Sequence, residues 1–121
     1  MKKVMIIDDE LDILDILERF LLRSGKLDVK VHSNPEAALT QAKNGGYDLI
    51  LSDVMMPSIN GLTILEEIKK TSPSTKVVLM TAYSTNAKKQ KSEELFVDGY
   101  LEKPFVNMKA VEQQLFSILG I

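Results

Sequence analysis

The sequence predicts an α/β fold in which a doubly wound, parallel five-stranded sheet carries helices on both faces. The main observation is that short apolar runs alternate five times with longer stretches of helical spacing, and no long linker interrupts the 121 residues. The second observation is the length, which allows one domain, residues 1–121, and leaves little room for another. Because strands that alternate with helices are joined by right-handed crossovers, helices cover both sides of the sheet.

The first half of the chain predicts two strand–helix units. Residues 3–8 form an apolar run without polar alternation, which is typical of a strand covered on both faces. A helix follows over residues 10–24 and ends at a glycine. Residues 28–32 alternate polar and apolar side chains, which predicts a half-exposed edge strand. Asn34 before a proline predicts the cap of a helix over residues 35–44.

The second half predicts the remaining elements. Residues 49–53 form another buried strand, and a helix over residues 62–71 ends before a proline. Residues 77–81 predict the fourth strand and residues 85–96 a polar fourth helix, which we expect to be short or shifted. The chain ends with a short strand over residues 99–102 and a last helix, which Asn107 caps and which ends at Leu119.

The composition excludes several classes of protein. The chain has 45% hydrophobic and 26% charged residues and no cysteine, which excludes disulfide scaffolds, thiolate metal sites and cysteine nucleophiles. The net charge of −2 gives no positive field for nucleic acid and no polybasic membrane anchor. The first apolar run ends at Asp8 and is too short for a signal peptide or a membrane span. We therefore expect a cytoplasmic protein that binds neither nucleic acid nor membrane directly.

Polar side chains close the predicted strands: Asp8 and Asp9 follow the first, Asp53 the third, Thr81 the fourth and Lys103 the fifth. The carboxyl ends of parallel strands meet at one edge of the sheet, where such folds place their sites. Three carboxylates at one edge repel each other unless protons or a cation neutralise them. Oxygen ligands without His or Cys favour Mg²⁺, with Mn²⁺ as a substitute.

A metal beside a lysine and a hydroxyl group favours a phosphoryl group as the ligand of this edge. The cation and the ammonium group of Lys103 would offset charge on the phosphoryl oxygens, and Thr81 would donate a hydrogen bond. One carboxylate can then be the nucleophile and form an aspartyl phosphate. Asp53 is the candidate, because it ends a central buried strand while Asp8 and Asp9 share a turn.

Four motifs lie at the predicted strand ends, in this order: Ile7-Asp8-Asp9-Glu10; Leu51-Ser52-Asp53-Val54-Met55-Met56-Pro57 with Asn60-Gly61; Leu79-Met80-Thr81-Ala82; and Tyr100-Leu101-Glu102-Lys103-Pro104-Phe105. Each motif alone is weak evidence, but the ordered set is a strong signal. Together they resemble the receiver domain of two-component response regulators, the CheY-like family, over essentially the whole chain. The resemblance implies a flavodoxin-like (βα)5 fold with strand order 2-1-3-4-5.

The resemblance also implies a role for each matched residue. Asp53 would accept a phosphoryl group from a phosphohistidine of a sensor histidine kinase or a histidine phosphotransfer protein. Asp9, Asp53 and the backbone carbonyl of Met55 would bind Mg²⁺, and Asp8 would act mostly through a metal-bound water. The chain would assist its own phosphorylation and dephosphorylation without turning over an outside substrate.

The resemblance assigns the other strand ends to phosphoryl binding and switching. Lys103 would pair with the phosphoryl group, and the bond to Pro104 would be cis. Thr81 would move toward a phosphoryl oxygen, Tyr100 would turn inward, and the small Ala82 would leave room for the group. The signal would leave through a protein target on the face formed by the fourth helix, the fifth strand and the fifth helix. The chain would be a monomer or a weak, phosphorylation-dependent dimer.

The first helix carries more leucine than one buried stripe needs. Five apolar side chains fall on one face, which we expect to be buried: Ile13, Ile16, Leu17, Phe20 and Leu21. Leu14 falls on the flank of this stripe and Leu11 nearly opposite it. Because family members dock the helical bundle of the phosphodonor beside the acidic turn, we expect Leu11 and Leu14, together with Pro57, to form a docking patch.

Two bulky side chains bear on the lifetime of the phosphorylated state. Met55 and Tyr83 each lie two residues beyond a site residue and flank the expected path of the hydrolytic water. We therefore expect slow dephosphorylation.

Alternatives remain open at this point. The chain could be a receiver domain from a longer regulator with a DNA-binding or enzymatic effector domain. An aspartate-nucleophile phosphatase is disfavoured, because Met55 occupies the position where that family has a second Asp. A flavodoxin-like electron carrier is disfavoured, because the acidic turn would repel the phosphate of FMN. Asp8 and Asp9 could also merely favour the first helix terminus.

Overall fold

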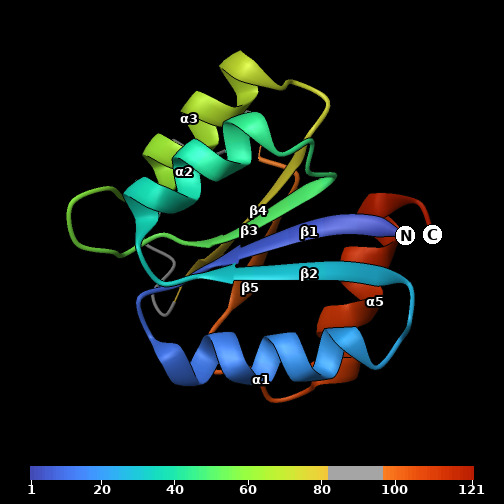
Figure 1. Ribbon diagram of the computed structural model, residues 1–121. Coiled ribbons are helices and arrows are strands. Elements are labelled where there is room, and N and C mark those ends of the chain that lie inside the picture. Colours follow the sequence, from blue (N-terminus) through green and yellow to red (C-terminus); the bar gives the residue numbers. More distant parts are fainter. Residues whose placement is uncertain (82–96) are drawn as a thin grey trace.

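The computed structural model describes residues 1–81 and 97–121. One sheet of five parallel strands runs in the order β2-β1-β3-β4-β5, and its strands are β1 (Lys2–Ile7), β2 (Leu27–His32), β3 (Leu49–Asp53), β4 (Lys76–Thr81) and β5 (Gly99–Glu102). The described helices are α1 (Leu11–Leu22), α2 (Pro35–Asn44), α3 (Gly61–Thr71) and α5 (Met108–Leu119). Helices α2 and α3 cover one face and α1 and α5 the other (Figure 1). This confirms the predicted fold and strand order; the expected fourth helix lies outside the described residues.

The core has two layers, one on each face of the sheet. In β1, Val4 and Ile6 face α1 and α5, whereas Met5 and Ile7 face α2 and α3, and all four side chains are fully buried. The absence of polar alternation in this strand therefore has its expected cause, which is burial on both faces. Strand β2 begins one residue earlier than predicted, because Leu27 pairs in register with the start of β1 and is itself buried.

Helix α1 is rotated from the orientation that the sequence predicts. Leu14, Leu17 and Leu21 face the sheet, and Leu14 is only 4% exposed. Ile16 is 50% exposed, so the prediction that it is buried is wrong. Both stripes are apolar at helical spacing, and the choice between them depends on how α1 packs between the sheet and α5, with which it shares the core.

Asparagine caps start three helices at the same edge of the sheet where the strands end. The side chain of Asn34 accepts hydrogen bonds from two backbone N–H groups of α2, Asn60 accepts one from α3, and Asn107 accepts one from α5. These side chains satisfy orphan N–H groups of the first helical turn. The caps thus fix where each helix begins and where the preceding loop ends. These loops lie at the edge of the sheet that holds the site.

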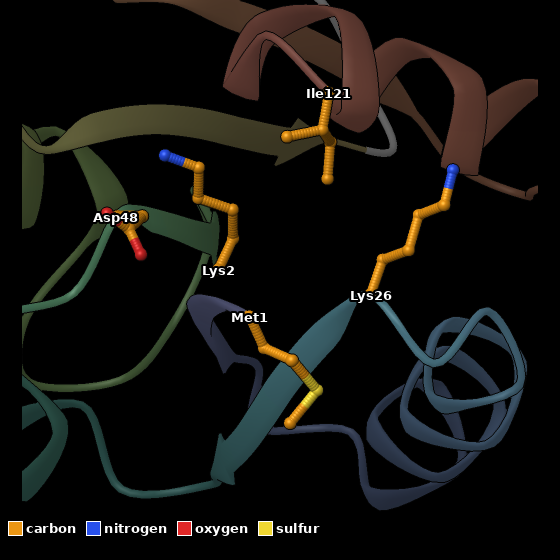
Figure 2. A pocket seen from close by; sticks show the side chains of 5 residues that line it. All are labelled: Met1, Lys2, Lys26, Asp48 and Ile121. Atoms are coloured by element: carbon orange, nitrogen blue, oxygen red, sulfur yellow. The ribbon is translucent and has the colours of Figure 1, made fainter.

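The amino-terminal edge of the sheet, at the opposite end of the strands, has an open hollow of about 670 Å³, lined by Met1, Lys2, Lys26, Asp48 and Ile121. In Figure 2 the side chains of Lys2 and Lys26 diverge, so their ammonium groups do not converge on one ligand. This hollow lacks the set of convergent polar groups that marks a binding site. None of the described helices is long and apolar enough to cross a lipid bilayer.

Candidate functional site

Three carboxylates meet at the carboxyl edge of the sheet. Asp8 directly follows β1, and Asp53 is the last residue of β3. Each of these residues and Asp9 offers one carboxylate oxygen, and the three oxygens lie within 4.8 Å of one another. Asp8 and Asp53 are 0% and 5% exposed, whereas Asp9 is open to solvent. Two adjacent strands thus bring together the acidic cluster that the sequence predicts.

Lys103 reaches this cluster from the loop after β5. Its Nζ donates a hydrogen bond to Oδ2 of Asp8 at 2.6 Å and lies 3.5 Å from Oδ2 of Asp53. Oε1 of Glu10 is 3.7 Å from the same nitrogen. The side chain of Lys103 is 9% exposed, and its bond to Pro104 is cis. The ammonium group therefore contacts both buried carboxylates, and it binds Asp8 more closely than Asp53.

The carboxylates of this cluster are hard to ionise together. Burial and then the negative charge of Asp8 raise the pKa of Asp53 to about 6, against the lowering effects of Lys103 and the Met55 backbone N–H. Burial also raises the pKa of Asp8 despite its hydrogen bond from Lys103. Burial alone would lower the pKa of Lys103, but its hydrogen bond with Asp8 and the charge of Asp53 raise it. Lys103 thus offsets only part of the cost of ionising the buried carboxylates.

A divalent cation fits this cluster for two reasons. The donors are carboxylate oxygens, which hard cations such as Mg²⁺ prefer. Burial first, and then the charge of Asp8, raise the pKa of Asp53, and a bound cation would favour its ionised form. The residues that could hold it are Asp8, Asp9 and Asp53.

Backbone contacts hold the loop after β3 against its neighbours. The N–H of Val54 donates to the carbonyl of Met80 in β4, and the N–H of Gly61 donates to the carbonyl of Val54. A Cβ atom on Gly61 would lie 2.5 Å from the carbonyl oxygen of Asp53, so only glycine permits this approach. The close contact of α3 therefore fixes the position of Asp53 in the site.

Thr81 and Tyr100 lie where the sequence places them, on neighbouring strands. Thr81 ends β4 and is 4% exposed, and its carbonyl accepts a hydrogen bond from the N–H of Lys103. Tyr100 is half-buried against the core layer under α2 and α3, and its carbonyl accepts a hydrogen bond from Gln114 of α5. Ala82 and Tyr83 lie outside the described residues.

Exposed apolar side chains lie on three loops and helix ends at this edge of the sheet. Leu11 at the start of α1 is 68% exposed, Met55 after β3 is 58% exposed, and Val106 after β5 is 96% exposed. Pro57 is exposed as well. We name these four residues the apolar rim. Leu14 belongs to the core, so the prediction that it helps to form a docking patch is wrong.

Sequence reasoning missed two features of the site. Val106 was not assigned a role, although an apolar residue in a loop at the carboxyl edge of the sheet is itself a signal. Glu10 was recognised only as part of the acidic turn, whereas the structure places its carboxylate beside Lys103.

The model of one protein family, described as the response regulator receiver domain, matches residues 4–115. The transcriptional regulatory protein PhoP of alkaline phosphatase synthesis, from Bacillus subtilis, is 35% identical over 104 residues, which cover 86% of this chain and 43% of PhoP. The chain thus spans less than half the length of the curated relatives it matches.

Solved structures show the same likeness over the whole fold. A CheY-like receiver domain protein from Methanospirillum hungatei superposes with a TM-score of 0.92 at 26% identity, covering 99% of this chain and 94% of that one. The chemotaxis protein CheY4 of Vibrio cholerae superposes with a TM-score of 0.87 at 27% identity, covering 98% of both chains.

Proposed function

Since this chain belongs to the family of response regulator receiver domains, we propose that Asp53 is the residue of this phosphoacceptor that receives the phosphoryl group. The donor would be a phosphohistidine on a sensor histidine kinase or a histidine phosphotransfer protein. One observation carries the assignment to Asp53. Asp53 is a buried carboxylate at the end of a central strand, with an oxygen within 4.8 Å of two further carboxylates, and it lies 3.5 Å from the ammonium group of Lys103.

The proposed reaction is an in-line displacement at phosphorus. A carboxylate oxygen of Asp53 forms the new P–O bond, the P–N bond to the imidazole breaks, and the imidazole leaves with the electron pair. Lys103 offsets charge on the phosphoryl oxygens from its place beside Asp53. Asp8, Asp9, Asp53 and the Met55 carbonyl would hold Mg²⁺, or Mn²⁺ in its place, which would supply further charge compensation.

The output of the switch would depend on residues next to the site. The Thr81 hydroxyl would turn toward the phosphoryl group, and Tyr100 would move into the space that it leaves. The signal would reach a protein target through a face that includes β5 and α5, the fourth helix being outside the described residues. We propose that the protein acts in the cytoplasm by protein contact, as a monomer or a weak dimer, and turns over no outside substrate.

A second function is a variant of the first. PhoP, a transcriptional regulatory protein, is more than twice as long as the stretch it shares with this chain. The described site would serve equally well as the receiver part of a longer regulator, where the switched face would act on an effector domain of the same protein.

The central experiment is phosphorylation by acetyl phosphate with Mg²⁺, followed by intact-mass spectrometry. We expect one added phosphoryl group on the wild type, none on Asp53→Asn, and none in the wild type when EDTA removes the metal. Asp28→Asn is the control, because it removes a carboxylate near the start of β2, at the edge of the sheet opposite to the site. Phosphorylation of Asp53→Asn at the wild-type rate would contradict the assignment.

A further inference from the structure

Glu10 occupies the N-cap position of α1 without capping it. Its side chain makes no hydrogen bond to the first turn of the helix, whereas α2, α3 and α5 have asparagine caps that do. Ser, Thr, Asp and Asn are the residues that stabilise this position. Glu10 departs from this capping preference next to the site, which suggests that it serves the site and not the helix.

The carboxylate of Glu10 lies on the solvent side of the site. Its side chain is 62% exposed and lies 3.7 Å from the ammonium group of Lys103, which is itself 9% exposed. The backbone N–H of Glu10 donates to Oδ1 of Asp8 at 2.9 Å, so the residue is anchored to the acidic cluster. A fixed negative charge is therefore held where a phosphodonor has to enter.

We propose that Glu10 is a specificity-determining residue, whose charge disfavours small dianionic phosphodonors, such as acyl phosphates, and attracts the divalent cation. This proposal rests on the function proposed above. Acetyl phosphate reacts when the Asp53 oxygen bonds to phosphorus, the P–O bond to the acetyl group breaks, and acetate leaves. Before the bond forms, the whole dianion must pass the Glu10 carboxylate.

The size of the effect follows from Coulomb's law. At roughly 7 Å in a water-like medium, a unit charge and a dianion repel by about 2 RT, and a monoanion by about half as much. Salt screens part of this repulsion. A protein donor would compensate for the repulsion by contacts with the apolar rim, which a small molecule cannot make. Glu10 would thus favour transfer from a docked protein over transfer from a small metabolite.

The test compares two small donors whose net charges differ at neutral pH: acetyl phosphate, close to −2, and phosphoramidate, close to −1. Phosphorylation rates are measured with saturating Mg²⁺ for the wild type, Glu10→Gln and Glu10→Lys. We expect Glu10→Gln to raise the rate with acetyl phosphate about 2- to 5-fold, and the rate with phosphoramidate by a smaller factor. Glu10→Lys should further increase the ratio of the rate with acetyl phosphate to the rate with phosphoramidate. Added salt should reduce the differences between the variants and the wild type.

Two control variants separate charge from structure. Glu66→Gln removes another carboxylate that pairs with a lysine, on α3, and should leave both rates as in the wild type. Glu10→Asp keeps the charge and should keep the ratio of the two rates. The Mg²⁺ affinity is a readout that needs no phosphorylation, and thermal unfolding at increasing Mg²⁺ concentration measures it. We expect this affinity to fall about 2- to 3-fold in Glu10→Gln.

The outcomes distinguish this inference from the proposed function. If the wild type accepts no phosphoryl group from either donor, the proposed function fails. If the wild type reacts but Glu10→Gln leaves both rates unchanged, or changes both by the same factor, the role of the Glu10 charge is refuted.

Discussion

Asp53 combines two properties that oppose each other in the metal-free protein. It must be ionised to act as a nucleophile, yet burial and the neighbouring charge of Asp8 raise its pKa to about 6. Its ordinary pKa is 3.8, so the unfolded chain gives up this proton more readily than the folded protein does. At neutral pH the ionised Asp53 therefore destabilises the fold, so the proposed function and stability make opposite demands on this residue.

The pH dependence of stability tests this conflict. A carboxyl group whose pKa is raised in the folded state favours folding at low pH, and that stability is lost as the pH rises through about 6. Asp53→Asn removes the charge, so without metal at pH 7 it should be more stable than the wild type by about 2 kcal/mol. The advantage should shrink toward pH 4. Urea unfolding in EDTA measures both, and an equal difference at the two pH values would contradict the argument.

We expect Met55 to control the access of water to Asp53, the proposed phosphorylation site. Its side chain is 58% exposed and follows Asp53 by two residues, at the edge where water enters. Met55→Asn replaces an apolar side chain with one that can hydrogen-bond a water, so we expect dephosphorylation to become several-fold faster. Loss of the phosphorylated mass over time measures the rate, and Leu22→Asn, at the far end of α1, is the control. An unchanged decay rate in Met55→Asn would refute the role of this side chain.

At the scale of elements, α3 positions Asp53, the proposed nucleophile, through its first residue. Gly61 approaches the Asp53 carbonyl more closely than any residue with a Cβ atom can, while Asn60 caps the helix. Neither contact involves the Asp53 carboxylate. The helix therefore acts on the site only through the backbone of the strand end.

Gly61→Ala should force that strand end away from α3. Overpacking of this kind costs about 1–3 kcal/mol, and the displaced carboxylate should also react more slowly with acetyl phosphate. Asn60→Ala is the comparison, because it removes a cap worth about 1 kcal/mol without a clash. We expect both variants to lose stability in urea unfolding but only Gly61→Ala to lose most of its phosphorylation rate. Similar rates in the two variants would show that the close approach does not position Asp53.

At the scale of the whole molecule, the apolar rim combines residues that lie far apart in the sequence but follow strands ending at the same edge of the sheet as the acidic site. Leu11, Met55 and Val106 follow three different strands, and their exposed side chains meet solvent at one edge of the sheet. Under the proposed function, a protein donor would bring a phosphohistidine to Asp53 across this edge. We therefore expect the rim, rather than the buried Leu14, to contact the donor.

A charge in the rim should separate protein donors from small ones. Leu11→Arg is expected to slow phosphotransfer from the cognate histidine protein by at least about tenfold, and to affect acetyl phosphate far less, because burying an unpaired charge in an apolar contact is costly. Leu22→Arg changes an exposed leucine of the same helix away from the site and serves as the control. Comparable losses in the two variants would argue against docking at the rim.

The sequence by itself determined the fold class, the order of the elements and the residues at the strand ends. These features rest on local information, because the alternation of apolar runs and the motifs that close them can be recognised without knowing any distance. Only the tertiary structure decided which stripe of α1 is buried, that Lys103 binds Asp8 more closely than Asp53, and that Glu10 faces Lys103 instead of capping its helix. Lys103 and Asp8 are 95 residues apart, so their contact depends on the packing of every element between them. Such distances depend on how complete helix and sheet faces pack into one core. The local periodicity of the sequence carries no information about that packing.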